Sequence, residues 1–154
     1  MIRVQSEDFD VGAEIAKLTE GNPKIGGVVS FTGLVRDIAG GDPVSAMTLE
    51  HYPGMTEREL TRIETEAHSR WALEASLIIH RFGRLEPGER IVLVVTASSH
   101  RQDAFDACQF LIDWLKTKAP FWKREEISGA GRWVEAKDED ESSAARWRKS
   151  SGVD

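Results

Sequence analysis

Residues 98–125 constrain the fold most, because they combine the pattern of a long amphipathic helix with a proline stop. Apolar residues recur there at helical spacing, at Ala104, Phe105, Cys108, Leu111, Ile112 and Leu115. The polar residues between them are expected to face water: Asp103, Asp106, Gln109, Asp113 and Thr117. Ser98 or Ser99 can cap the first turn, and Pro120 predicts a helix end near Lys118. Other elements must therefore bury one face of this helix.

Cationic side chains stand at both ends of the predicted helix. His100 and Arg101 lie at its start, where free backbone N–H groups favour an anion. Lys116 lies near its end on the border of the apolar stripe, and Lys123 follows the proline. A chain reversal at the proline would bring both lysines to one pocket, whereas an unbroken helix would hold them about 10 Å apart along its axis. The spacing favours an anion pocket; the plainer alternative is lysines that cap carbonyl groups or remain solvated.

Other residues of the chain are candidates to bind an anion or a metal, or to act as a nucleophile. Arg36 follows the apolar segment 27–33 and can hold a phosphate by two hydrogen bonds or pair with a surface carboxylate. The four histidines have no His-x-x-x-His spacing and Cys108 has no partner cysteine, so no metal site is expected. Cys108 lies on the apolar stripe and is expected to act as a small buried hydrophobe, not as a nucleophile. No nucleotide-binding or serine-hydrolase motif occurs.

The other hydrophobic patterns predict short strands interleaved with two further helices. Strands are expected over residues 2–4, 27–33, 44–52, 75–82, 90–97 and 132–135. One helix is expected after Asp10, and another begins with a capping box formed by Thr56 and Glu59. The Gly-rich tract 38–43 is expected to be a surface loop. This order predicts an α+β fold, with helices packed on a mainly antiparallel sheet.

Length, charge and cysteine content limit the class of protein. The 154 residues fit one domain, expected over 1–137, followed by a polar tail over 138–154 that is partly helical or disordered. The formal net charge of -6 argues against a general nucleic-acid binder. One cysteine and no long apolar run favour a cytoplasmic protein, with neither a disulfide framework nor a membrane span.

Four segments carry a resemblance to a known family, and a fifth extends it. They are residues 29–36 (VSFTGLVR), 49–57 (LEHYPGMTE), 79–83 with 87–89 (IHRFG and PGE), 99–101 through 116–125 (SHR and KTKAPFWKRE), and 132–136 (RWVEA). Over residues 1–137 the chain resembles the large, catalytic subunit of molybdopterin synthase. That resemblance implies an α/β hammerhead fold and a homodimer. It also implies a small ubiquitin-like subunit at each end of a heterotetramer, whose C-terminal Gly-Gly thiocarboxylate enters the pocket.

The resemblance also implies an activity and its residues. The family converts cyclic pyranopterin monophosphate to molybdopterin by inserting two sulfurs as a dithiolene, a sulfurtransferase step of molybdenum cofactor biosynthesis that requires no resident cofactor. Lys116 and Lys123 match its catalytic lysines. Together with these two, the matching substrate contacts are Leu34, Val35, Arg36, His100, Arg101, Arg124 and Glu125. Phe31 and Pro120 match apolar positions around the site, and Lys137 stays unassigned because the family often has arginine there.

Two other classes of function stay open at this point. The chain could be a non-catalytic module that holds a phosphorylated metabolite or a partner's carboxylate tail. It could also be a stand-alone sulfurtransferase that uses Cys108. Because the only cysteine is expected to be buried, we expect the sulfur to arrive on a partner protein.

Overall fold

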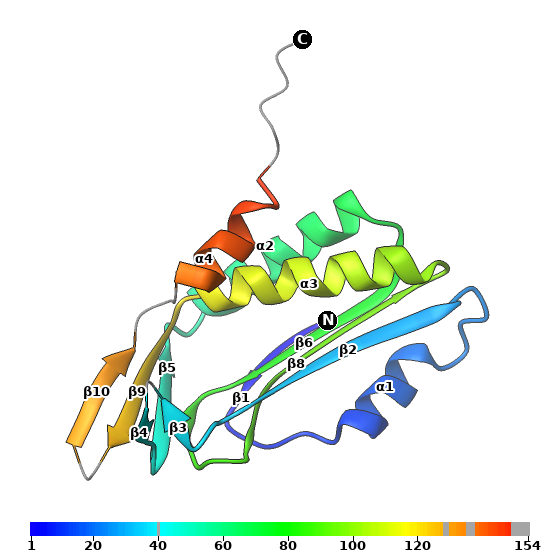
Figure 1. The fold of residues 1–154 in the computed structure, drawn as a ribbon. Coiled ribbons are helices and arrows are strands. Elements are labelled where there is room, and N and C mark those ends of the chain that lie inside the picture. Colours follow the sequence, from blue (N-terminus) through cyan, green and yellow to red (C-terminus); the bar gives the residue numbers. More distant parts are fainter. Residues whose placement is uncertain (40, 128–129, 135–137, 149–154) are drawn as a thin grey trace.

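A computed structural model describes residues 1–39, 41–127, 130–134 and 138–148. The described chain forms two four-stranded sheets, a two-stranded hairpin and four helices (Figure 1). The helices are α1 (Val11–Thr19), α2 (Met55–Arg70), α3 (Arg101–Thr117) and α4 (Asp138–Ala145). The predicted α+β class and the mainly antiparallel pairing are both confirmed.

The first sheet has the strand order β1-β6-β8-β2. Its strands are β1 (Ile2–Gln5), β6 (Leu73–Arg81), β8 (Arg90–Ser98) and β2 (Gly27–Leu34). β1 runs parallel to β6, whereas the other two pairings are antiparallel. Alternate residues of β6 and β8 point to opposite faces, so both faces of the sheet's centre are apolar. Helices α2 and α3 cover one face and the short helix α1 covers the other (Figure 1).

The second sheet has the order β10-β9-β5-β7, and all of its pairings are antiparallel. Its strands are β10 (Ala130–Val134), β9 (Phe121–Ile127), β5 (Ala46–His51) and β7 (Gly83–Leu85). The chain passes from β6 to β7 through the single residue Phe82. Gly83 follows with a φ of 93°, a value that side-chain-bearing residues rarely adopt. This glycine therefore permits the sharp passage from one sheet to the other.

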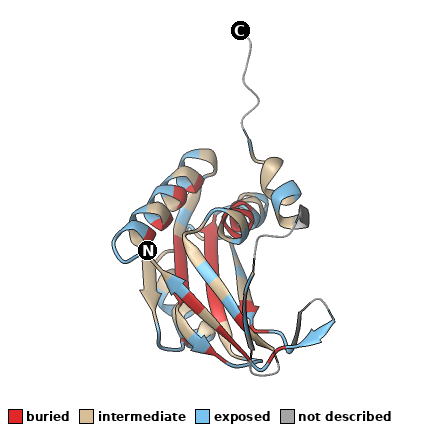
Figure 2. Ribbon diagram, turned by 90° about the vertical axis from the view of Figure 1, so that its left-hand side faces the viewer, coloured by how far each residue is buried: buried red, intermediate tan, exposed pale blue. Residues whose placement is uncertain are grey.

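The core lies between the first sheet and helices α2 and α3, and it continues under the second sheet (Figure 2). Leu60 of α2, Ile78 of β6 and Leu111 of α3 are fully buried there. Each such side chain contributes about 1.5–3 kcal/mol of burial free energy. Met47 and Leu49 of β5 extend the same cluster into the second sheet. The two sheets thus share one core.

Several local predictions were wrong. β9 was not predicted as a strand, and the tract 38–43 is not simply a loop, because β3 (Ile38–Ala39) pairs with β4 (Asp42–Pro43). Helix α2 begins two residues earlier than predicted, and Glu57, not Glu59, accepts a hydrogen bond from the N–H of Gly54 at 2.6 Å.

The start of α3 also differs from the prediction. Its N-cap residue is His100, not a serine, and no side chain caps the helix. Ser98 is instead the last residue of β8, where its hydroxyl donates to the carbonyl of Ala72 at 2.6 Å. The predicted end of the helix is confirmed, because Lys118 is the C-cap residue.

Two residues of α3 lie on the face opposite to the one predicted. Phe105 is 56% exposed, although its spacing placed it on the buried stripe. Asp113 was expected to face water but is buried. Its carboxylate accepts from Arg146 at 2.9 Å and from Trp147, both of which follow α4. The segment after α4 therefore covers a part of α3 that would otherwise be solvated.

Candidate active site

The two candidate lysines come from adjacent elements at one end of the molecule. Lys116 lies in the last turn of α3 and is exposed. Lys123 lies on β9 and is half-buried. It stands opposite Leu49 of β5, a buried core residue, and so lies on the inner face of the second sheet. Pro120 follows the end of the helix between them, and the chain turns there into β9, which leads away from α3 (Figure 1).

Both lysines act on one buried side chain, His80 of β6. Burial lowers the pKa of His80 to about 3, and the positive charges of Lys123 and Lys116 lower it further. The hydrogen bond between His80 and the carbonyl of Arg81 opposes this shift only in part. Because a charge affects a pKa only at short range, both amines lie close enough to this ring to disfavour its charged form.

The predicted contacts at the end of β2 lie on this side of the molecule too. Val35 is buried in the core cluster, and its N–H donates to the carbonyl of Glu89 at 2.9 Å. Leu34 and Arg36, on either side of it, are both exposed. Val35 thus fixes the backbone from which Arg36 extends into solvent, where its guanidinium is available to an anion.

Two neighbouring residues of β9 face opposite sides of the second sheet. Glu125 is buried on the same inner face as Lys123. Arg124 is exposed on the outer face, where its guanidinium lies across Gly131 so closely that a Cβ there would stand 2.1 Å from Nε. Arg124 is therefore held on the other side of the strand from the lysines. Phe31 and Pro120 are half-buried, and Lys137 lies outside the described residues.

His100 and Arg101 lie far from the lysines within one chain. Both are exposed at the start of α3, whereas Lys116 is in its last turn. A helix of 17 residues is about 25 Å long, so one small anion cannot contact both ends. The prediction that both groups of cations face a common guest is therefore not met inside a single chain (Figure 1).

Cys108 is buried in α3 and unsuited to nucleophilic chemistry. Burial raises the pKa of its thiol to about 11, and a hydrogen bond with Thr96 only partly opposes this. A thiol with so high a pKa carries almost no thiolate near neutral pH, and thiolate is the nucleophilic form. The expectation that Cys108 behaves as a small buried hydrophobe is confirmed.

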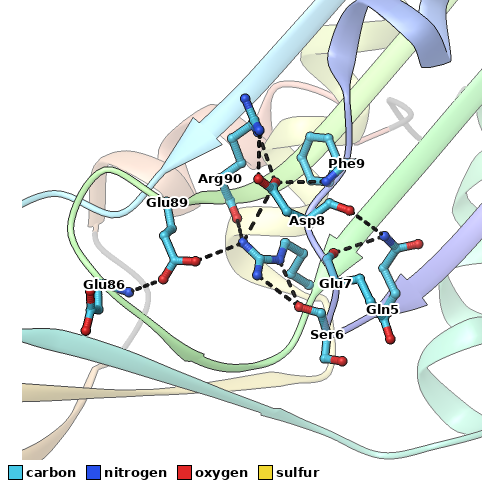
Figure 3. Close-up of polar contacts among 9 residues, drawn as sticks. Gln5, Ser6, Glu7, Asp8, Phe9, Glu86, Glu89 and Arg90 are labelled. Atoms are coloured by element: carbon cyan, nitrogen blue, oxygen red, sulfur yellow. Dashed lines mark hydrogen bonds and ion pairs between the residues drawn. The ribbon is translucent and has the colours of Figure 1, made fainter.

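A separate polar network stands at the far face of β6 (Figure 3). The buried guanidinium of Arg81 donates to the carbonyl of Ser6 at 2.9 and 3.0 Å and to that of Arg90 at 2.9 Å. Arg90 in turn donates to both carboxylate oxygens of Asp8, at 3.0 and 2.7 Å. These bonds tie the segment before α1 to β6 and β8, so this network stabilises the fold.

Two hollows are lined by residues other than the candidate lysines. One, of about 620 Å³, is lined by Tyr52, Pro53, Gly54, Met55 and Arg58. The other, of about 490 Å³, is lined by Asp8, Phe9, Asp10, Val11, Gly12 and Arg90. Among the described residues no group of three or more His, Cys, Asp or Glu is placed to hold a metal ion. In the same part of the chain, every helix is too short or too polar to cross a membrane.

The residues that sequence reasoning missed are aromatic. His51, His80 and Phe82 contact Phe121 or one another where the two sheets meet. The signal for His80 was a histidine directly after the apolar residues 77–79 of β6, but spacing along one strand could not reveal its neighbours on β9.

Known proteins resemble this chain in sequence and in fold. A family model described as MoaE protein matches residues 4–118. A molybdopterin synthase catalytic subunit of Ralstonia nicotianae is 56% identical over 146 residues, which cover 95% of this chain and 83% of the relative. One from Mesorhizobium japonicum is 55% identical over 152 residues, covering 97% and 94%. The solved structure of a molybdopterin biosynthesis MoaE protein from Burkholderia ambifaria superposes with a TM-score of 0.82 at 51% identity, covering 96% and 97%.

Proposed function

From the premise that this chain belongs to the MoaE family, we propose that it is the catalytic subunit of a molybdopterin synthase and acts in molybdenum cofactor biosynthesis. Its substrate is cyclic pyranopterin monophosphate, and its product carries a dithiolene. The enzyme is in this sense a sulfurtransferase and uses no resident cofactor.

The observation that carries this proposal is the position of the two lysines. Lys116 lies in the last turn of α3, Lys123 is the third residue of β9, and both charges act on the buried ring of His80. Fixed cations at one place in an acidic protein suit a phosphate-bearing substrate whose negative charge increases during the reaction. The buried Cys108 cannot carry the sulfur. The sulfur therefore comes from outside this chain.

The donor is the thiocarboxylate at the C-terminal Gly-Gly of a small ubiquitin-like subunit. In each transfer the thiocarboxylate sulfur bonds to a carbon of the pterin while a carbon–oxygen bond at that carbon breaks. Water then cleaves the tail's carbon–sulfur bond, which leaves the sulfur on the pterin and the tail as a carboxylate. Lys116 and Lys123 stabilise the negative charge that develops as the sulfur attacks and the cyclic phosphate opens, and one of them acts as general acid. Arg36 holds the phosphate, and Leu34, Val35 and Glu125 shape the surroundings. Arg124, on the other face of β9, lies outside this arrangement within one chain.

A homodimer completes the site. His100 and Arg101 lie at the opposite end of α3 from Lys116, so they can contact the same substrate only if a second copy brings them. A dimer with two-fold symmetry does so twice, since whatever one chain gives to its partner it also receives. With a small subunit at each end the assembly is a heterotetramer that works in the cytoplasm.

The test is a reconstituted reaction with purified chain, thiocarboxylated small subunit and pyranopterin substrate. Lys116→Ala and Lys123→Ala should each lower dithiolene formation by at least about a hundredfold while the small subunit still binds. The matched control is Lys118→Ala, because Lys118 is an exposed lysine two residues after Lys116. Normal turnover by Lys116→Ala would remove that residue from the mechanism. Binding of tail and substrate without product from the wild-type chain would instead indicate a non-catalytic binding module.

A further inference from the structure

Four aromatic rings meet where the chain passes between the two sheets. His80, the last residue but one of β6, stacks on Phe121, the first residue of β9, with ring centroids 3.7 Å apart and planes inclined by 16°. His51, at the end of β5, lies 4.6 Å from Phe82 and 5.9 Å from Phe121. The rings therefore hold together three places where the chain changes direction: after β5, between β6 and β7, and between α3 and β9.

The ring of His80 has a fixed orientation. It is buried, and its Nδ1 lies 2.8 Å from the carbonyl oxygen of Arg81. A carbonyl oxygen can only accept a hydrogen bond, so Nδ1 carries the proton. On the opposite face of the strand, the side chain of Arg81 donates to the carbonyl of Ser6. The end of β6 is thus held on both faces, and the imidazole cannot turn without losing a buried hydrogen bond.

This ring contacts the segment that joins the two lysines. Phe121 lies two residues before Lys123 on the same face of β9, and five residues after Lys116. A stack on Phe121 therefore fixes the first residues of β9 against β6, which belongs to the sheet that α3 covers. The low pKa of His80, which follows chiefly from burial, also keeps the ring neutral beside Lys123 and Lys116. A neutral ring adds no repulsion to two amines that a common anion must bring together.

We propose that His80 is a positioning residue for the sulfur-transfer reaction: clamped by the Arg81 carbonyl and stacked on Phe121, it fixes where β9 starts and so how Lys123 stands relative to Lys116. This inference rests on the proposed function of the two lysines. His80 itself touches neither sulfur nor pterin.

The test separates the two contacts of the ring. His80→Phe keeps an aromatic face for Phe121 but loses the donor to Arg81, whereas His80→Asn keeps a donor near the position of Nδ1 but loses the stack. Each variant should lower kcat by at least about tenfold, because small displacements of catalytic groups are costly. The KM for the pyranopterin and the affinity for the small subunit should stay within about threefold, since neither contact binds them.

The matched control is Ile79→Val, which shortens the side chain of the residue before His80. Ile79 is also buried but lies on the opposite face of β6. It should lower the melting temperature without a comparable loss of kcat. Wild-type kcat in both His80 variants would overturn the proposal. The proposal would also be overturned if Ile79→Val lost as much kcat as a His80 variant with the same melting temperature, because that result indicates general loosening of the fold.

A second measurement covers the case in which the His80 variants do not fold. Phe121→Leu removes the other half of the stack and leaves β6 intact. In protein whose lysines carry ¹³C-methyl groups, this change should shift the NMR signals of Lys116 and Lys123 but not that of Lys17 on α1. Unchanged lysine signals together with unchanged kcat would overturn the positioning role. An active Lys116→Ala enzyme would instead overturn the proposed function. The NMR signals of the lysines would still test the positioning role in that case, because they do not depend on turnover.

Discussion

Cys108 and His80 are both buried, and in both burial disfavours the charged form of the side chain. For the thiol this raises the pKa to about 11, and for the imidazole it lowers the pKa to about 3. The thiol of Cys108 and the imidazole of His80 are thus neutral at neutral pH. The exposed Lys116 and Arg36 are the cations available to bind an anion.

For Cys108 we expect slow modification and a dispensable thiol. A thiol reagent at pH 8 should react with the native chain at least about tenfold more slowly than with the urea-unfolded chain, because little thiolate forms and access is blocked. Cys108→Ala should keep kcat for dithiolene formation within about twofold and destabilise the fold by about 1 kcal/mol through lost packing. A well-folded but inactive Cys108→Ala protein would point to a persulfide on this residue.

For His80 we expect a pH-dependent stability. The unfolded chain binds a proton at this residue below pH 6.5, whereas the folded chain does not until about pH 3. The free energy of unfolding should therefore be full above pH 6.5 and fall by up to about 1.4 kcal/mol per pH unit between these values. His80→Phe should flatten that slope in urea titrations. Asp8 does not interfere above pH 4, because Arg90 lowers the pKa of its carboxyl to about 2 and its effect begins below 3.8.

At the scale of elements, β9 shows where sequence reasoning fails. Its residues alternate faces, but Lys123 and Glu125 occupy the inner face and Arg124 the outer one, so the strand has no apolar period. The inward face of a strand is usually apolar, but functional sites retain charged residues there. Apolar alternation therefore fails to predict a strand at such a site. The helices α1 and α3 and the apolar strands were predictable, because their periodicity reflects burial on one face.

The C-terminal segment shows the other limit, which is contact between distant parts of the chain. Asp113 has the spacing of a solvated residue, and nothing in α3 indicates that Arg146 and Trp147 will cover it. Trp147 also packs on Trp71 and Phe110, with ring centroids 5.5 and 5.8 Å away. A helical pattern predicts which residues share a face, but not what covers that face.

We expect Asp113 to anchor this segment. Asp113→Ala removes the acceptor for Arg146 and Trp147 and should lower the free energy of unfolding by about 1–3 kcal/mol. Amide exchange should rise most in α4. Asp106→Ala is the matched control, because Asp106 also accepts from a glutamine four residues earlier but makes no hydrogen bond with residues 146–148, the described part of the segment after α4. It should cost under about 0.5 kcal/mol. Equal effects of the two changes would contradict the anchor.

At the scale of the whole molecule, α3 separates two groups of cations that the proposed chemistry needs together. His100 and Arg101 stand at one end and Lys116 at the other, about 25 Å away along the axis. Spacing in the sequence sets that distance, but it does not say which chain's cations meet. A mixing experiment can therefore test whether each site takes Lys116 from one copy and Arg101 from the other.

Lys116→Ala and Arg101→Ala should each be inactive alone but restore activity when co-expressed. If every site takes Lys116 from one chain and Arg101 from the other, a mixed dimer has one doubly altered site and one intact site. With random pairing, half the dimers are mixed, so the preparation should recover about one quarter of wild-type turnover. The control is Lys116→Ala co-expressed with Lys123→Ala, two residues that a site takes from the same chain. That pair should restore equal activity only if the two lysines of a site also come from different copies. No recovery in the mixture of Lys116→Ala and Arg101→Ala would place each site within one chain.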